Sequence, residues 1–254
     1  MWSGKRDIAA LLMEFIGPFA LVFMGAGAII QTQGQNLVAI ALAHGLAIGL
    51  LVAAGGHISG GVYNPALAVG LMAAGKLPYA RGGMFIIAQL LGGTAAAAVL
   101  KATLPTAAVD AVKLGTPLPG AGIGAGQAFV VEIVLTFFLM FVVFGVAVDK
   151  RGPATIAGLA IGLTITMDIS MGGGISGAAM NPARWFGPAL VQGEWTAAWV
   201  YIVGPIVGAV IAALLYTFVM LDDTEENKAV ALPQTADAPV RSSNPAGRSA
   251  GRRR

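Results

Sequence analysis

Long apolar stretches alternate with short polar segments along most of the chain. Six of these stretches hold about 20 residues, the length that a helix needs to cross the hydrocarbon core of a bilayer. They cover approximately residues 8–30, 37–56, 81–100, 128–148, 154–171 and 197–219. The pattern therefore predicts an all-α membrane protein with six transmembrane helices.

The composition changes this picture little and supports it. Of the 254 residues, 57% are hydrophobic and only 11% are charged, whereas a soluble domain carries about a quarter of charged residues. The first stretch is too long for a signal peptide and contains Glu14, so we expect it to remain as a span.

The two halves of the chain repeat each other. Glu14 precedes Asn64 by 50 residues and Glu132 precedes Asn181 by 49, and ISGGVYNPALAVGL at 58–71 is echoed by ISGAAMNPARWFGPAL at 175–190. Each half, about 8–100 and 128–219, has three spans. Because this number is odd, the second copy enters from the opposite face, which predicts an inverted repeat about an axis in the membrane plane.

Each Asn-Pro pair predicts the start of a short helix. Asparagine is a good N-cap and proline suits the first helical position, so helices should begin after Asn64, running towards Ala74, and after Asn181. About ten residues rise roughly 15 Å, half of a roughly 30 Å hydrocarbon core. Two half-helices from opposite faces can therefore meet at the midplane as a seventh, broken span, preceded by irregular backbone in GGHISGG (55–61) and GGGISGA (172–178).

The chemistry of this junction indicates a channel. If each asparagine caps its own helix with its side-chain oxygen, its NH2 donors stay free for a solute oxygen. Both helix N-termini also point at the junction, and their positive ends disfavour cations and hydronium. A passage that is polar enough to hold water yet hostile to positive charge favours a neutral-solute channel over the usual role of Asn-Pro as loop punctuation.

The loop charges predict the orientation. Six lysines and arginines lie on one side if the spans alternate, and only Lys101 and Lys113 lie on the other, which places both termini in the cytoplasm. We expect residues 1–220 to form the channel domain. Residues 221–254 are polar and predict a disordered cytoplasmic tail.

Several classes of protein are disfavoured. The chain has no cysteine, which excludes disulfides and thiol catalysis, and we expect no metal site and no cofactor. No nucleophile, base and orienting residue recur at useful spacing, so an enzyme is not expected. The basic residues reflect membrane orientation and indicate no nucleic-acid partner. A coupled transporter would need an ion site and more spans than this chain offers.

These residues closely resemble the aquaporin (major intrinsic protein) family over about residues 8–219. The resemblance rests on the Glu in the first and fourth spans, on the arginine after the second box, and on the two Asn-Pro-Ala boxes, Asn64, Pro65, Ala66 and Asn181, Pro182, Ala183. It implies six tilted helices and two half-helices with one pore in each subunit. It also implies a homotetramer in membrane lipid, and we expect the plasma membrane.

The resemblance further implies a selectivity filter formed by His44, Ile169, Ala178 and Arg184. Arg184 would donate to the solute and repel cations, and His44 would add a polar wall. Water-selective members place Phe and His where this chain has His44 and Ile169, whereas His, Ile, Ala and Arg are similar to tonoplast and archaeal members. The set therefore implies a channel for water and for small neutral solutes such as hydrogen peroxide, ammonia or urea.

Two alternatives stay open. Glycerol facilitators usually carry an acidic residue where this chain has Trp185 and a basic one where it has Ala189, so both departures favour the water-channel branch. The pair Tyr201 and Ile202 is mixed and keeps a facilitator for glycerol or small polyols possible. A structural membrane-junction protein on the same scaffold is the other alternative.

The remaining polar residues in the spans need partners. Glu14 and Glu132 should support the pore by capturing backbone N–H groups or water around the irregular loops, with a proton relay as the alternative. His57 matches a family position near the cytoplasmic mouth and either gates or packs against the loop. Asp168 either faces the outer interface or pairs with Arg184 or His44, where it would admit ammonium.

Overall fold

The computed structural model describes residues 4–222. Six helical segments in this range are long and apolar enough to cross a membrane, which confirms the predicted number. The predicted tail lies outside the described residues, apart from Leu221 and Asp222. The helices that cross the bundle are α1 (Lys5–Thr32), α2 (Leu37–Ser59), α4 (Tyr79–Thr103), α6 (Ala125–Val143), α7 (Ala157–Gly172) and α9 (Ala198–Leu215).

The shorter elements complete and connect these spans. A π-helical turn extends α6 (Phe144–Val148) and another extends α9 (Tyr216–Met220), and a 3-10 turn precedes α7 (Ala154–Ile156). The connection between α4 and α6 contains α5 (Thr106–Ala111) and a 3-10 turn (Lys113–Gly115). The two half-helices are α3 (Pro65–Ala73) and α8 (Pro182–Gln192), so the predicted broken seventh span is confirmed.

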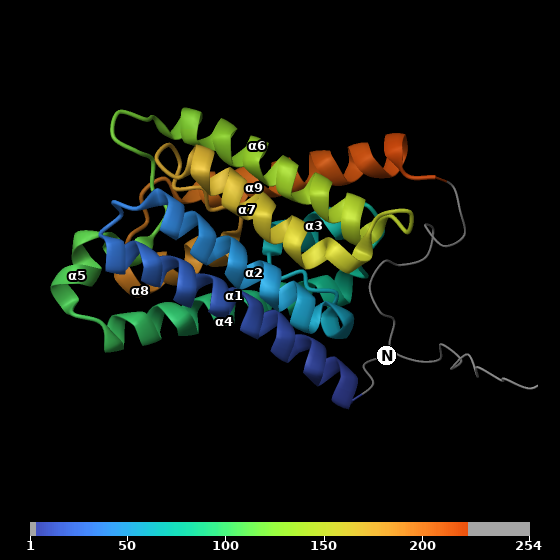
Figure 1. The fold of residues 1–254 in the computed structure, drawn as a ribbon, viewed down its shortest axis with the longest axis horizontal. Coiled ribbons are helices and arrows are strands. Elements are labelled where there is room, and N and C mark those ends of the chain that lie inside the picture. Colours follow the sequence, from blue (N-terminus) through green and yellow to red (C-terminus); the bar gives the residue numbers. More distant parts are fainter. Residues whose placement is uncertain (1–3, 223–254) are drawn as a thin grey trace, which may run out of the picture.

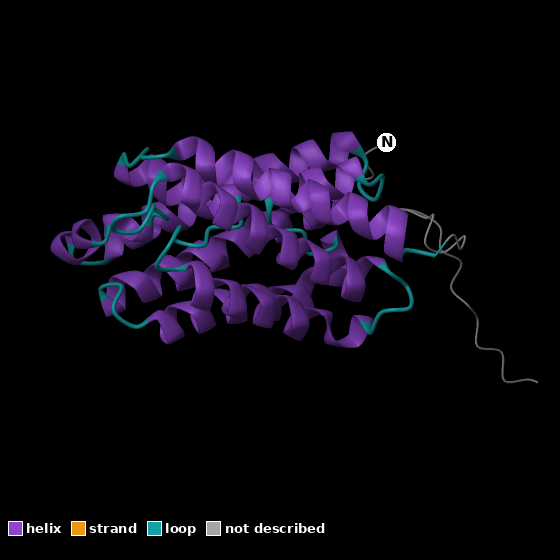
Figure 2. Cartoon of the chain, turned by 90° about the horizontal axis from the view of Figure 1, so that it is seen from above, coloured by secondary structure: helices purple, strands orange, loops and turns teal. Residues whose placement is uncertain are grey.

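The helices form one elongated bundle in which both described ends of the chain lie at the same end (Figure 1). We call this the near end. The α5 region lies at the opposite, far end. Loops thread the middle of the bundle between the helices, where the half-helices begin (Figure 2). This arrangement agrees with an even number of spans.

Close helix packing depends on residues without side chains. The repeat-related helices α2 and α7 pack along their length. A Cβ on Gly162 would lie 2.6 Å from the Gly45 carbonyl oxygen, and one on Gly158 would lie 2.5 Å from that of Gly49. Because real Cβ atoms do not come so near, glycine is required there for the two backbones to touch.

The distribution of exposed and buried side chains fits a protein that is surrounded by lipid. Large apolar side chains such as Leu46, Leu50 and Leu163 are more than half exposed on the outside of the bundle, whereas Glu14 and Glu132 are completely buried inside it. Lipid cannot satisfy polar groups, so acids are turned inwards to protein donors.

One sequence expectation about the backbone is wrong. The GGHISGG segment was expected to be irregular, but α2 continues through His57 to Ser59 and ends at Gly60, which has φ 98°. Backbone N–H and C=O groups at this depth need partners, and the helix supplies them for as long as it continues. The irregular backbone is therefore confined to the few residues before Asn64. In the second repeat α7 ends at Gly172, as expected.

Candidate channel site

Each half-helix is capped by its own asparagine. The side-chain oxygen of Asn64 accepts a hydrogen bond from the Ala66 N–H at 2.9 Å. That of Asn181 accepts from Ala183 at 2.9 Å and from Arg184 at 3.3 Å. The prolines stand at the first helical positions. The caps predicted from the sequence are therefore confirmed, and both N-termini point at the midplane.

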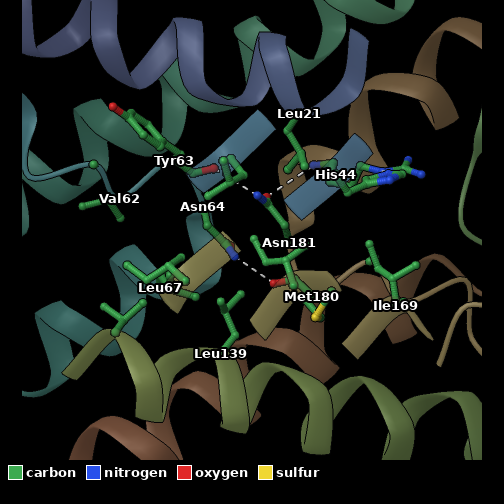
Figure 3. A pocket seen from close by; sticks show the side chains of 18 residues that line it. Leu21, His44, Val62, Tyr63, Asn64, Leu67, Leu139, Ile169, Met180 and Asn181 are labelled. Atoms are coloured by element: carbon green, nitrogen blue, oxygen red, sulfur yellow. Dashed lines mark hydrogen bonds between the residues drawn. The ribbon is translucent and has the colours of Figure 1, made fainter. Parts of the chain in front are cut away.

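The two asparagine amides also bind across the midplane, as Figure 3 shows. Asn64 Nδ2 donates to the Met180 carbonyl at 2.8 Å, and Asn181 Nδ2 donates to the Tyr63 carbonyl at 3.0 Å. This corrects the expectation that both donors of each amide stay free, because one N–H of each holds the opposite loop. One N–H of each amide is left for a solute.

Glu14 anchors the first loop with four hydrogen bonds. Its Oε1 accepts from Ser59 Oγ at 2.6 Å and from the Val62 N–H at 3.0 Å. Its Oε2 accepts from the Tyr63 N–H and from Gln89 Nε2, both at 2.7 Å. The carboxylate thus turns the N–H groups of the irregular backbone away from the cavity.

Glu132 does the same for the second loop with three hydrogen bonds. Its Oε1 accepts from Ser176 Oγ at 2.7 Å and from the Ala179 N–H at 2.8 Å, and its Oε2 accepts from the Met180 N–H at 2.7 Å. The expected capture of loop N–H groups by both acids is confirmed.

A guanidinium and an imidazole meet at the far-end side of the cavity. Arg184 Nε donates to His44 Nε2 at 2.9 Å, and Arg184 Nη2 donates to the Gly115 carbonyl at 2.9 Å. His44 Nδ1 lies 2.8 Å from the Ile40 carbonyl. Since Nε2 accepts, Nδ1 must carry the hydrogen, so the imidazole is neutral. Arg184 Nη1 is buried and has no protein partner among the described residues.

All four residues of the expected filter line one narrow cavity of about 30 Å³, together with both asparagines. Its other walls are mostly apolar and include Leu21, Ile48, Leu67, Leu139, Val143, Ile161 and Ile165. Polar groups are therefore few along this passage, and each of them has a fixed position.

The narrow cavity shares lining residues with two wider recesses. His44, Ile169 and Arg184 also line a recess of about 300 Å³ at the far end. Leu67 and Ile161 also line a larger recess of about 760 Å³, which extends to His57 and Lys150 and also runs along the outer surface of α2 and α7 at Leu46, Leu50 and Leu163. The residues shared with the far-end recess include the polar pair His44 and Arg184, whereas those shared with the larger recess, such as Leu67 and Ile161, are apolar.

Two predicted residues lie away from the narrow cavity. His57 is exposed in the last turn of α2 and lines only the larger recess. Asp168 is 2% exposed, so it does not face the outer interface. Its Oδ2 is buried without a hydrogen-bond partner in the described part of the chain, and His44 and Arg184 bind other groups. Both expectations for Asp168 are therefore wrong.

The sequence analysis missed two groups in the site. Gln89 is a fully buried polar residue in an apolar span, so the reasoning applied to Glu14 would have found it. The Gly115 carbonyl has no signal in the sequence, because every residue offers a backbone carbonyl. Residues 4–222 contain no group of three His, Cys, Asp or Glu side chains that could hold a metal ion.

A bundle of two inverted repeats around a narrow passage, with two capped half-helices at its centre, defines a passive membrane channel. The family model for the major intrinsic proteins matches residues 1–216. The chain is 40% identical to aquaporin NIP1-1 of Zea mays over 84% of this chain and 75% of that protein. It is 42% identical to aquaporin TIP2-1 of Arabidopsis thaliana over 86% of this chain and 90% of that protein.

A solved structure supports the same relationship. The fold matches the aquaglyceroporin from Plasmodium falciparum with a TM-score of 0.76 and 26% identity, covering 84% of this chain and 96% of that one. The chain belongs to the major intrinsic protein family. It is therefore a multi-pass membrane channel of the class that conducts water and small solutes, and not an enzyme.

Proposed function

We propose that the chain conducts water together with small neutral solutes such as hydrogen peroxide, ammonia and urea, and that it excludes protons and ions. The observation that carries this proposal is the junction where Arg184, held by His44 and Gly115, stands in one cavity wall with Ile169. Arg184 leaves Nη1 for a solute oxygen, while Ile169 offers no competing hydrogen bond.

Solute selection at this junction follows from its two walls, one of which carries a guanidinium while the other is apolar. A buried guanidinium repels cations and hydronium, and the N-termini of α3 and α8 add positive potential at the midplane. An apolar wall makes no hydrogen bonds. It therefore admits a solute that has both donor and acceptor groups but does not form hydrogen bonds on every side, as water does. His44 uses both ring nitrogens on protein partners, so its role here is to orient Arg184 rather than to bind solute.

The pore residues keep the roles that the family resemblance implies. Asn64 and Asn181 orient the solute with their remaining N–H groups, while Pro65, Ala66, Pro182 and Ala183 form the first turns behind them. Ala178 completes the filter and leaves space because its side chain is small. Glu14 and Glu132 support the loops, and His57 stands at the wide near-side mouth.

Stopped-flow light scattering on proteoliposomes tests this proposal with the variants Ile169→His and Ile169→Val. Wild type should conduct water rapidly and pass urea and ammonia. Ile169→His adds a polar wall and should lower urea permeability relative to water by about ten-fold, whereas Ile169→Val keeps the wall apolar and should change the ratio little. Unchanged urea selectivity in Ile169→His would contradict the assignment of the filter.

A glycerol facilitator is the second candidate, because the matching solved structure is an aquaglyceroporin. Trp185 and Ala189 depart from the facilitator pattern, and neither lines the narrow cavity. Glycerol uptake by the same proteoliposomes decides between the two. Uptake as fast as that of urea would favour the facilitator.

Family membership also supports proposals for the assembly and the location. A homotetramer is typical of this family, so we propose four subunits with one pore each, surrounded by lipid. We further propose the plasma membrane, and the loop charges support an orientation with both termini in the cytoplasm and the far end outside. Mass measurement in detergent and protease access to intact cells test these two statements.

A further inference from the structure

The loop between α4 and α6 reaches into the channel site through a single backbone atom. The carbonyl oxygen of Gly115 accepts a hydrogen bond from Arg184 Nη2 at 2.9 Å. Gly115 also lines the far-end recess beside His44 and Arg184. The orientation of the guanidinium therefore depends on where this loop stands.

The loop is built to place this carbonyl. Lys113, Leu114 and Gly115 have φ values of 49°, 55° and 65°, a left-handed run that side chains disfavour. Leu114 is completely buried against α1 and α4 and anchors the turn. A Cβ on Gly115 would lie 2.9 Å from that of Ala26, so only glycine fits between the loop and α1.

An ion pair joins the same turn to the half-helix that carries Arg184. Lys113 Nζ binds Glu194 Oε2, and Glu194 follows Gly193, the C-cap of α8. Glu194 is held in turn by Thr196, whose N–H donates to Oε1 at 3.1 Å. Helix α8 thus binds Gly115 through Arg184 near its start and binds Lys113 through Glu194 just after its end.

We propose that the Lys113–Glu194 ion pair is a positioning device for the selectivity filter, because it ties the acceptor of Arg184 to the helix that carries Arg184. The inference rests on the proposed function and names a determinant of solute selectivity outside the pore wall. Without the pair, Leu114 still anchors the turn, but the turn loses its link to α8, so the Gly115 carbonyl can shift relative to Arg184 Nη2 and holds the guanidinium less firmly. A guanidinium with more freedom leaves, on average, a wider junction.

The charge of this pair persists over the physiological pH range. Hydrogen bonding from Lys113, followed by that from Thr196, lowers the pKa of Glu194 to about 2. A lowered carboxyl pKa means that the pair is present at neutral pH and is lost only as the pH falls towards that value. Selectivity should therefore be constant between about pH 5 and pH 8 as far as this pair is concerned.

The test measures urea and glycerol permeability relative to water in proteoliposomes. Lys113→Met and Glu194→Gln should each raise these ratios about two- to five-fold, the range that an exposed ion pair can supply. The charge reversal Lys113→Glu/Glu194→Lys should restore the wild-type ratios. Lys101→Met is the matched control, because Lys101 in the last turn of α4 donates to the Val191 carbonyl of α8 at 2.9 Å and does not bind the Gly115 turn.

Two further measurements separate positioning from a general structural role. In an Arg184→Leu background, Lys113→Met should have no added effect on selectivity, since the group that it positions is gone. In about 1 M salt, where the Debye length is about 3 Å, the permeability ratios of the wild type should change in the same direction as those of Lys113→Met. Equal shifts in Lys101→Met, or unchanged ratios in both single variants, would overturn the inference while wild-type water flux supports the proposed function. A wild type that conducts neither water nor solutes overturns both.

Discussion

The two repeats hold their midplane loops with unequal strength. In the first, Glu14 receives two donors on each carboxylate oxygen, one of them from Gln89. In the second, Glu132 receives two donors on one oxygen and one on the other. Asp168 interacts electrostatically with Glu132 and has an unpartnered oxygen. The second half thus keeps the scaffold of the first, but its carboxylate accepts one hydrogen bond fewer and a further buried acid lies near it.

The lining of the passage divides in the same way. Leu21 and Leu139, Ile48 and Ile165, and the two asparagines occupy equivalent places and are matched in chemistry. The polar pair His44 and Arg184, however, is equivalent to Ile161 and Leu67. The inverted symmetry therefore maps a polar far-end junction onto an apolar near-end junction. Matched positions line the passage, and unmatched positions from both repeats form the junction that we propose as its filter.

The largest effect should come from removing either buried carboxylate. In Glu14→Gln the amide nitrogen faces two donors whichever way it turns, which costs roughly 2–6 kcal/mol, whereas in Glu132→Gln it can face the single donor at a cost of roughly 1–3 kcal/mol. The unfolding midpoint in detergent should therefore fall about twice as far for Glu14→Gln. Equal falls would show that the extra donors do not matter and would remove this asymmetry.

The next largest effect should come from making the second repeat resemble the first. Arg184→Leu removes the positive charge and the solute donor from the far-end junction. We expect about a ten-fold rise in urea and glycerol permeability and measurable cation conductance, with water permeability within about two-fold of wild type. Leu67→Met at the equivalent near-end position is the control and should change none of these. Cation exclusion that survives in Arg184→Leu would assign that exclusion to the helix N-termini alone.

A smaller effect should come from removing the unmatched acid. Asp168→Asn removes a buried carboxyl group whose Oδ2 has no hydrogen-bond partner in the described residues, so stability should rise by about 1 kcal/mol, or roughly 2–4 °C in the unfolding midpoint. Water and ammonia permeability should stay unchanged, since Asp168 does not line the cavity. A fall in the midpoint, or altered ammonia flux, would give Asp168 a role that these contacts do not explain.

The sequence predicted what depends on short-range rules. The caps at Asn64 and Asn181 follow from local hydrogen bonding, and the six spans follow from hydrophobic length. The type of partner that Glu14 binds could also be expected, because an acid within the bilayer needs hydrogen-bond donors from the protein. Local rules were sufficient for these features. A helix cap, the length of a span and the need of a buried acid for hydrogen-bond donors do not depend on which residue lies nearby in the fold.

Features that depend on tertiary approach were beyond the sequence. The crossing bonds of Asn64 and Asn181 exist only because the two loops meet. The placement of Asp168 is the exception, because it could have been predicted: one residue turns a helix by about 100° and so separates it from Ile169 in the cavity wall. The Gly115 carbonyl became an acceptor only because its loop folds back over α1.

The crossing asparagine bonds also bear on how the chain is made. They join residues 116 and 118 positions apart, so the first half-helix cannot complete its contacts when it leaves the ribosome. At about 5–20 residues per second, its partner follows roughly 6–24 s later. During that interval the Tyr63 carbonyl and the Asn64 amide lack their native partners inside the bilayer. The centre of the passage therefore cannot mature before the second half-helix has been synthesised.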